Sequence, residues 1–312
     1  MKALNSSRIL IKQNKITIFF LFIFSYLFFL FEFKEFILWS QILEFYEISS
    51  ISSIKAHTIR ILLINGLVYL VQFFLGVDRI LAFNITAHII LFFSTVIFSK
   101  IVYESITKKI FPIILISIIP ILISFFQNGR GIFGCFSILL LFYTLSIKKV
   151  KLKWISLVVA AFFSNVSSGI FSVLLITIIL GALNKSFFFI KKKHLIFILF
   201  LTLPLFIIYL DKNLKFYDYD LFKLLSHGLG MIFHVNYNIL LPLGLIFFTI
   251  FFLISFYLFI INSKIIYTIE FPFITASIIG LFFGFSSFNC FIYVYLLLFL
   301  QKLNFVQKNK LK

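Results

Sequence analysis

Long runs of apolar residues, separated by short lysine-rich clusters, dominate the chain. Eight of these runs contain no Asp, Glu, Lys or Arg: Ile16–Phe31, Ile80–Ser99, Ile110–Phe126, Gly131–Ile147, Trp154–Leu183, Leu195–Leu210, Ile239–Ile261 and Phe271–Leu300. A run of about 18 or more such residues can cross a bilayer as a helix. Because backbone groups in lipid must pair internally, the spans should be helices. The pattern predicts an all-α, polytopic membrane helical bundle with roughly nine to ten membrane segments, some of them short, broken or re-entrant.

Composition supports one integral membrane domain over the whole chain. The 312 residues are 62% hydrophobic and only 12% charged, and the mean hydropathy is +1.15. The longest polar stretches, about 32–60 and 211–238, are too short for an added soluble domain. The net charge of +18 is explained by lysines in cytoplasmic loops. We therefore expect no nucleic-acid partner.

Lysine clusters predict which side of the membrane each loop occupies, because cytoplasmic loops are rich in Lys and Arg. The clusters stand around Lys2–Lys15, Lys100–Lys109, Lys148–Lys153, Lys185–Lys193 and Lys302–Lys312. An even number of crossings must separate any two of them. Ile110–Phe126 and Gly131–Ile147 fit as a hairpin with its tip outside, and Leu195–Leu210 with Ile239–Ile261 fits as a second. Three apparent spans between Ile16 and Lys100 give odd parity, so we interpret Ile61–Gly76 as re-entrant.

Two of the long runs have polar residues at their centres. Trp154–Leu183 is interrupted at Ser164–Gly169, and Phe271–Leu300 is interrupted at Gly284–Asn289. Each could be one long tilted helix, or two short helices that meet at the polar break. Non-helical backbone at membrane depth needs protein or a wet cavity around it. We predict two short helices in each case.

Polar segments on the outer side carry an amphipathic pattern. In Glu32–Arg60, acidic residues interleave with aromatic and aliphatic ones, which is typical of a helix lying in the membrane interface. Phe216–Phe233 has a similar character. Both are predicted to lie outside the cytoplasm.

Arginine is rare, and its placement differs from that of lysine. Of four arginines, Arg60, Arg79 and Arg130 are predicted to lie on the outer side. The guanidinium group presents a rigid fork of donors that suits phosphate and diphosphate. These three arginines therefore indicate a site for an anionic lipid headgroup. The alternative is that each arginine pairs with a nearby carboxylate, such as Asp78.

Histidines offer candidates for proton transfer. His227 follows Asp218 and Asp220 in the outer polar segment, and a histidine beside a carboxylate can act as a general base. Ordinary loop polarity explains the same residues. His88 lies inside an apolar run, so it should face the bundle interior. Hydrogen bonding to a neighbouring carbonyl is the expected role of its side chain.

Several function classes lack their sequence signatures. The chain has no Gly-rich phosphate loop and no His-Glu-x-x-His zinc motif. No acidic residue stands at the middle of a predicted span, which argues against an ion-driven pump. Cys135 and Cys290 lie in apolar runs, so we expect neither a disulfide nor a metal site. The sequence predicts no cofactor and no metal.

Three short stretches resemble a known family. They are Asn65–Gly76 followed by Val77-Asp78-Arg79, then Gly129-Arg130-Gly131-Ile132-Phe133-Gly134, and then Phe163-Ser164-Asn165-Val166-Ser167-Ser168. In this order they resemble the Wzy-type and EpsG-type polysaccharide polymerases of bacterial envelopes, over about residues 30–185. In those families an arginine begins the comparable span. A histidine often stands at the later interruption, where this chain has Asn165.

The resemblance implies a concrete activity. Such enzymes work at the outer face of the bacterial cytoplasmic membrane on polyprenyl-diphosphate-linked oligosaccharides, building O-antigen, capsule or exopolysaccharide. They transfer the glycan to an acceptor hydroxyl alongside other polysaccharide-assembly proteins. Substrate binding would fall to Arg130, Arg79, Arg60, Asn165 and Asp78, and proton transfer to His227 or Asp220. The alternatives are a flippase for the same lipid-linked sugar and a non-enzymatic membrane subunit.

Overall fold

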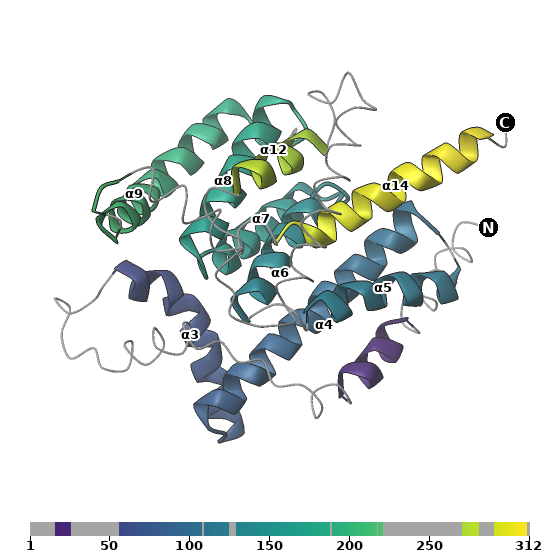
Figure 1. Ribbon diagram of the computed structural model, residues 1–312, viewed down its shortest axis with the longest axis horizontal. Coiled ribbons are helices and arrows are strands. Elements are labelled where there is room, and N and C mark those ends of the chain that lie inside the picture. Colours follow the sequence, from purple (N-terminus) through teal and green to yellow (C-terminus); the bar gives the residue numbers. More distant parts are fainter. Residues whose placement is uncertain are drawn as a thin grey trace.

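Every regular element in the described part of the chain is a helix (Figure 1). The computed structural model describes residues 16–25, 56–107, 109–124, 129–187, 189–216, 218–220, 270–280 and 290–310. Within those ranges the predicted all-α class is confirmed. Most of the predicted amphipathic segment 32–60, the segment 221–238 and the Ile239–Ile261 run lie outside the described residues.

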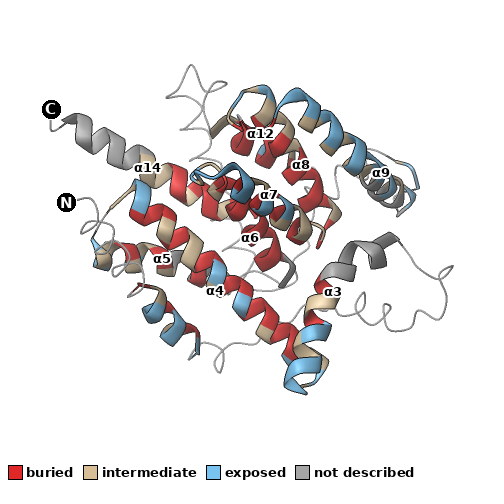
Figure 2. Cartoon of the chain, turned by 180° about the vertical axis from the view of Figure 1, so that it is seen from behind, coloured by how far each residue is buried: buried red, intermediate tan, exposed pale blue. Residues whose placement is uncertain are grey.

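The helices follow the predicted apolar runs closely. After a short helix at Ile16–Ser25, the labelled helices are α3 (Ala56–Leu75), α4 (Arg79–Ser105), α5 (Ile110–Ser124), α6 (Gly129–Tyr143), α7 (Val150–Ser164), α8 (Ser168–Leu183), α9 (Lys192–Phe216), α12 (Glu270–Gly280) and α14 (Ile292–Lys310). Buried residues concentrate along α4, α6 and α8, whereas α9 is exposed along much of its length (Figure 2).

Helices α3 and α4 are joined by a tight turn. Gly76 adopts a φ of +62° there, a left-handed conformation that glycine reaches without the steric cost of a Cβ. Asp78 then caps α4, because its Oδ1 accepts a hydrogen bond from the Leu81 N–H at 2.8 Å. The two helices pack against each other. Apart from Gly76, the Ile61–Gly76 run is thus part of α3, a continuous 20-residue helix that is about 30 Å long.

Helix α6 packs between α4 and α7. Near the starts of α4 and α6, the ring centroids of Phe83 and Phe133 are 6.1 Å apart. Near their ends, Lys100 Nζ lies 5.1 Å from the ring centroid of Tyr143. These two contacts show that α4 and α6 run in the same direction. Helix α5 also packs on α4.

Hydrogen bonds between helices fix α7 antiparallel to α6. Ser137 Oγ donates to the Ala160 carbonyl at 2.7 Å, and Ser156 Oγ donates to the Leu140 carbonyl at 3.3 Å. Both serines are buried. Cross-helix hydrogen bonds from serine hydroxyls are a typical way to hold helices in an apolar medium.

The predicted break in Trp154–Leu183 is confirmed. Helix α7 ends at Ser164 and α8 begins at Ser168, and the connecting Val166 and Ser167 are buried. In Phe271–Leu300, Cys290 and Phe291 form a turn between α12 and α14, so one continuous helix is excluded there too. The predicted break site Gly284–Asn289 itself lies outside the described residues.

Helix α8 runs in the direction of α6. It begins near Gly134, where a Cβ would come 2.6 Å from Ile170 Cδ1. Just after α8 ends, Phe187 contacts Phe273 of α12, with centroids 6.3 Å apart. Phe273 in turn contacts Phe142 at the end of α6, at 5.2 Å. Helix α12 covers α8, and α14 packs on α4 and α6.

Among the described residues, one helix is long and apolar enough to cross a membrane. It is α4, with 27 residues and a hydropathy of 2.1 over its most apolar window, of which 56% is buried. Six other apolar stretches of 10 to 17 residues lie in helices: Ile16–Ser25, Ile64–Leu75, Gly131–Tyr143, Ser168–Leu183, Glu270–Gly280 and Ile292–Gln301. The described residues thus form an all-helical structure with one candidate membrane span, and the number of crossings is taken up below.

Two helix ends differ from the predicted boundaries. Helix α4 continues past Ser99 to Ser105, because Lys100 lies against the Tyr143 ring and its charge does not end the helix. Helix α9 continues past Leu210 to Phe216. There Lys215 and Asp211 form an ion pair one helical turn apart, with 2.6 Å between Nζ and Oδ2, and such spacing supports a helix.

Candidate functional site: the arginine end of the bundle

The starts of α4 and α6 lie together at one end of the bundle. Arg79 is the first residue of α4, and Arg130 is the second residue of α6. About one turn further along each helix, the fully buried rings of Phe83 and Phe133 contact each other. Two arginines that are 51 positions apart in sequence are therefore carried on neighbouring helix starts. The Arg79 side chain is partly buried.

The turn between α7 and α8 lies at the same end. Phe163, two residues before Asn165, stacks on Phe133 with centroids 6.0 Å apart and an interplanar angle of 8°. It also meets Phe136 edge-on at 5.0 Å. Phe83, Phe133 and Phe163 thus form an aromatic group beneath the three segments that carry Arg79, Arg130 and Asn165. We call this end of the bundle the arginine end.

Close packing brings the start of α8 to the arginine end as well. At Gly134 a Cβ would lie 2.6 Å from Ile170 Cδ1 and 3.2 Å from Cys290 Cβ, so only a residue without a Cβ fits the present packing. Helices α4, α6 and α8 therefore all begin here. A helix N-terminus carries a partial positive charge, and three of them with two arginines make this end electrostatically positive.

The opposite end of the bundle is rich in lysine. It holds Lys100 near the end of α4, Lys149 and Lys153 at the start of α7, and Lys192 at the start of α9. The start of α9 is tied to that of α7 by an edge-on contact between Trp154 and His194 at 5.2 Å. We call this the lysine end. The predicted segregation from lysine is thus matched by the direction of the helices for Arg79 and Arg130.

Two of the predicted binding residues have local structural roles. Asp78 caps the N-terminus of α4 through the Leu81 N–H. Asn165 Nδ2 donates to the Ala161 carbonyl at 2.7 Å, which satisfies one of the carbonyls left open at the end of α7.

The remaining predicted residues stand on other parts of the chain. Asp220 follows the end of α9, on a different element from the aromatic group. Arg60 lies in the first turns of α3, at the far end of that helix from the turn that leads to Arg79, so the structure does not bring it to the arginine end. His227, the predicted base, lies outside the described residues.

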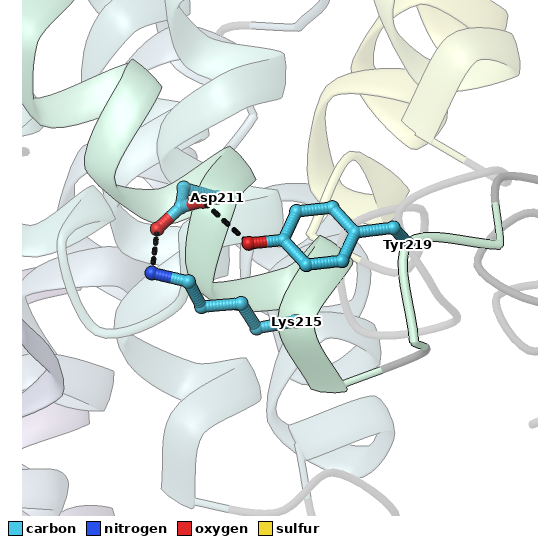
Figure 3. A network of polar contacts seen from close by, with 3 residues as sticks. All are labelled: Asp211, Lys215 and Tyr219. Atoms are coloured by element: carbon cyan, nitrogen blue, oxygen red, sulfur yellow. Dashed lines mark hydrogen bonds and ion pairs between the residues drawn. The ribbon is translucent and has the colours of Figure 1, made fainter.

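The chain after α9 is held by a small polar network (Figure 3). Asp211 pairs with Lys215 and also accepts a hydrogen bond from the Tyr219 hydroxyl at 3.4 Å. Asp218 and Tyr219 have positive φ angles of 54° and 60°. The Tyr219 N–H bonds to the Leu214 carbonyl at 2.8 Å, which is a common way to end a helix. The hydrogen bond and charge of Asp211 raise the pKa of the exposed Lys215. The network fixes how the chain leaves α9 toward Asp220.

Buried polar groups in α3 and α4 were predicted only in part. His88 is buried as expected, and its Nδ1 is 2.9 Å from the Asn84 carbonyl. Asn65 of α3 is also buried, and within the described residues its side-chain amide has no hydrogen-bond partner. The side chains of Cys135 and Cys290 are buried in the core. The aromatic group was missed by sequence reasoning, although each ring stands within four positions of a singled-out polar residue.

The described residues define a helical protein with a candidate membrane span and no cluster of three His, Cys, Asp or Glu side chains that could hold a metal ion. Comparison with known proteins adds no relative: no family model, no curated protein and no solved structure matches the chain.

Proposed function

We propose that the chain is a multi-pass enzyme of the bacterial cytoplasmic membrane that polymerises lipid-linked oligosaccharide repeat units. Its donor is a glycan on polyprenyl diphosphate, and its acceptor is a sugar hydroxyl at the outer face. The product is O-antigen, capsule or exopolysaccharide. The single observation that carries the proposal is the contact between Phe83 and Phe133, because it brings two arginine-bearing helix starts together.

The chemistry of the arginine end suits a diphosphate. Arg79 and Arg130 can each offer two parallel N–H donors to phosphate oxygens. The starts of α4, α6 and α8 add the positive ends of three helix dipoles. Positive charge placed where a leaving diphosphate gains negative charge would lower the barrier to its departure.

The reaction balances without nucleotide or metal. The acceptor hydroxyl oxygen forms a bond to the anomeric carbon of the donor glycan. The bond between that carbon and the diphosphate oxygen breaks, and polyprenyl diphosphate leaves with the bonding electrons. A base on the segment that follows α9, His227 or Asp220, takes the hydroxyl proton.

The distribution of basic residues supports the orientation. Lysines collect on the cytoplasmic side of membrane proteins, and the lysine end would lie there. The arginine end would then face outward, where lipid-linked repeat units are polymerised. In this arrangement the chain has roughly nine to ten membrane segments, and the turn between α7 and α8 sits among buried side chains rather than in lipid.

The test is polymer formation by arginine variants in the native host. We expect Arg79→Ala and Arg130→Ala each to abolish the ladder of polymer sizes on a gel, with single repeat units accumulating on the outer face. Arg79→Lys keeps the charge but loses the fork, so its ladder should be weak. Arg8→Ala, in the predicted cytoplasmic cluster, is the matched control and should leave the ladder normal.

Membrane fractions from each strain show that the variant protein is inserted at normal levels. Normal ladders from both alanine variants would contradict the arginine mechanism. Repeat units that accumulate on the inner face in a strain lacking the protein would identify a flippase instead.

A further inference from the structure

Two lysine-rich loops meet on one surface at the lysine end. The first joins α6 to α7, and the second joins α8 to α9. Trp154 at the start of α7 contacts Phe189 of the second loop at 5.6 Å and His194 of α9 at 5.2 Å. Lys153 is buried with its Nζ 5.2 Å from the Phe189 ring centroid. These contacts make the two loops one surface.

That surface carries a high density of positive charge. Seven lysines of the two loops and the adjoining helix starts are exposed: Lys148, Lys149, Lys151, Lys185, Lys191, Lys192 and Lys193. The sequence contains no Asp or Glu between Glu104 and Asp211. Glu270 lies one turn before Phe273, which contacts Phe187 near the second loop. The lysines therefore greatly outnumber the carboxylates on the elements that pack nearby.

The charge is also placed against the local helix dipoles. Helices α7 and α9 both begin on this surface, and neither has an acidic residue in its first turn. A helix N-terminus favours anions and disfavours cations. The lysines at these two neighbouring helix starts repel one another, and each is also repelled by the positive end of a helix dipole. An anion supplied from outside the chain would relieve this repulsion.

Exposed apolar faces begin directly beside the lysines. On α7 they are formed by Val150, Leu152, Ile155 and Val158, and on α9 by Ile196, Phe197, Phe200 and Leu201. Phe200 is 78% exposed. A soluble polyanion would neutralise the lysines and leave these faces in water. A ligand with an anionic head and hydrocarbon tails would cover both.

We infer that the lysine end binds anionic phospholipid, with phosphate headgroups on the lysines of the two loops and acyl chains along α7 and α9. The inference rests on the membrane insertion in the proposed function, but not on the polymerase chemistry. Each lysine near an anionic lipid surface strengthens the attraction to that surface about fivefold. The site would hold α7 and α9 at a defined depth in the leaflet.

The test uses Trp154 as a reporter, because the chain has only one other tryptophan, Trp39. The full-length Trp39→Phe protein is reconstituted into phosphatidylcholine vesicles that contain a small fraction of brominated lipid, whose bromines quench nearby tryptophan. We expect brominated phosphatidylglycerol to quench Trp154 at about a fivefold lower mole fraction than brominated phosphatidylcholine does. The excess should shrink as salt screens the headgroups.

Two charge-matched variants decide the outcome. Neutralising Lys149, Lys151, Lys192 and Lys193 to Gln should remove the preference for the anionic lipid. Neutralising Lys302, Lys308, Lys310 and Lys312 to Gln removes the same amount of charge elsewhere in the chain. This second variant should keep the preference for the anionic lipid. Equal quenching of Trp154 by both lipids, in the protein whose lysines are intact, would overturn the lipid site. An equal loss of the preference for the anionic lipid in both variants would overturn it too. If neither lipid quenches Trp154, the placement of the lysine end in the membrane is wrong. That result is distinct from a normal ladder in the arginine variants, which would contradict the polymerase chemistry.

Discussion

The rings of Phe83 and Phe133 lie 6.1 Å apart, both fully buried, about one turn inside the starts of α4 and α6. This contact joins two parts of the chain that each begin with an arginine. Phe133 also stacks on Phe163 beneath the turn between α7 and α8. One side chain therefore organises the three segments that make up the arginine end.

Removing the Phe133 ring should loosen the arginine end as a unit. Phe133→Ala loses contacts with both Phe83 and Phe163, and in a packed core such a change costs about 3–5 kcal/mol. Lipid solvates an exposed ring better than water does, so we expect the lower part of that range. The measurement is the free energy of unfolding of the purified protein in detergent.

A double-mutant cycle isolates the ring contact itself. Phe83→Ala and Phe133→Ala together should be less destabilising than the sum of the two, with a coupling of about 0.5–1.5 kcal/mol. Phe200→Ala, at an exposed position on α9, is the matched control and should change stability little. Strict additivity of the two buried substitutions would contradict the contact.

Gly134 should tolerate no side chain. In Gly134→Ala the new Cβ would lie 2.6 Å from Ile170 Cδ1 and 3.2 Å from Cys290 Cβ, so we expect a loss of about 1–3 kcal/mol from overpacking. Ile170→Val removes the nearer atom and should recover part of the loss. Thermal unfolding in detergent measures both changes.

Gly66 provides the control for this experiment. It lies inside α3, and a Cβ there would meet nothing within 4 Å. Gly66→Ala should therefore stabilise α3 by up to about 1 kcal/mol, because alanine is the better helix former. Equal effects of alanine at positions 66 and 134 would show that α6 and α8 do not approach as described.

The hydrogen bond from Ser137 to Ala160 should contribute measurably to the pairing of α6 and α7. Ser137→Ala loses the 2.7 Å bond between helices, and we expect a cost of about 0.6 kcal/mol, with an upper bound near 1.7 kcal/mol. Ser146→Ala is the control, since Ser146 is exposed and its hydroxyl donates to the Tyr143 carbonyl of its own turn. A larger effect at Ser146 than at Ser137 would contradict this packing.

Much of the helix pattern could be predicted from the sequence, because apolar runs and their punctuation are local signals. The polar residues Ser164–Gly169 marked the turn between α7 and α8 correctly. The gap between the Ile61–Gly76 and Ile80–Ser99 runs likewise coincides with the turn before α4. The predicted helix ends were wrong where a charged residue contacts a partner on its own helix or on a neighbouring helix. Lys100 against Tyr143 and Lys215 against Asp211 both let a helix run past the expected boundary.

The candidate site could be predicted only as a set of residue types. Arg79 and Arg130 stood out because arginine is rare and was expected on one side. Their proximity could not be predicted, because it depends on how the helices pack. Helices α4 and α6 run in the same direction, and α7 runs antiparallel to α6. The pairing of Phe83 with Phe133 is one of many possible pairs among 49 phenylalanines. Asp78 and Asn165 also illustrate that a polar residue at a helix end often serves the helix first.

The most direct test of the account is the sidedness of positions 79 and 130. Single variants Arg79→Cys and Arg130→Cys are made in a background where Cys135 and Cys290 are alanine, with Lys149→Cys and Lys192→Cys as markers of the opposite end. A membrane-impermeant thiol reagent is applied to intact cells from which any outer barrier has been removed. We predict labelling at 79 and 130 without permeabilisation, and at 149 and 192 only after it. Labelling of 79 and 130 from the cell interior alone, or from opposite sides, would contradict the proposal.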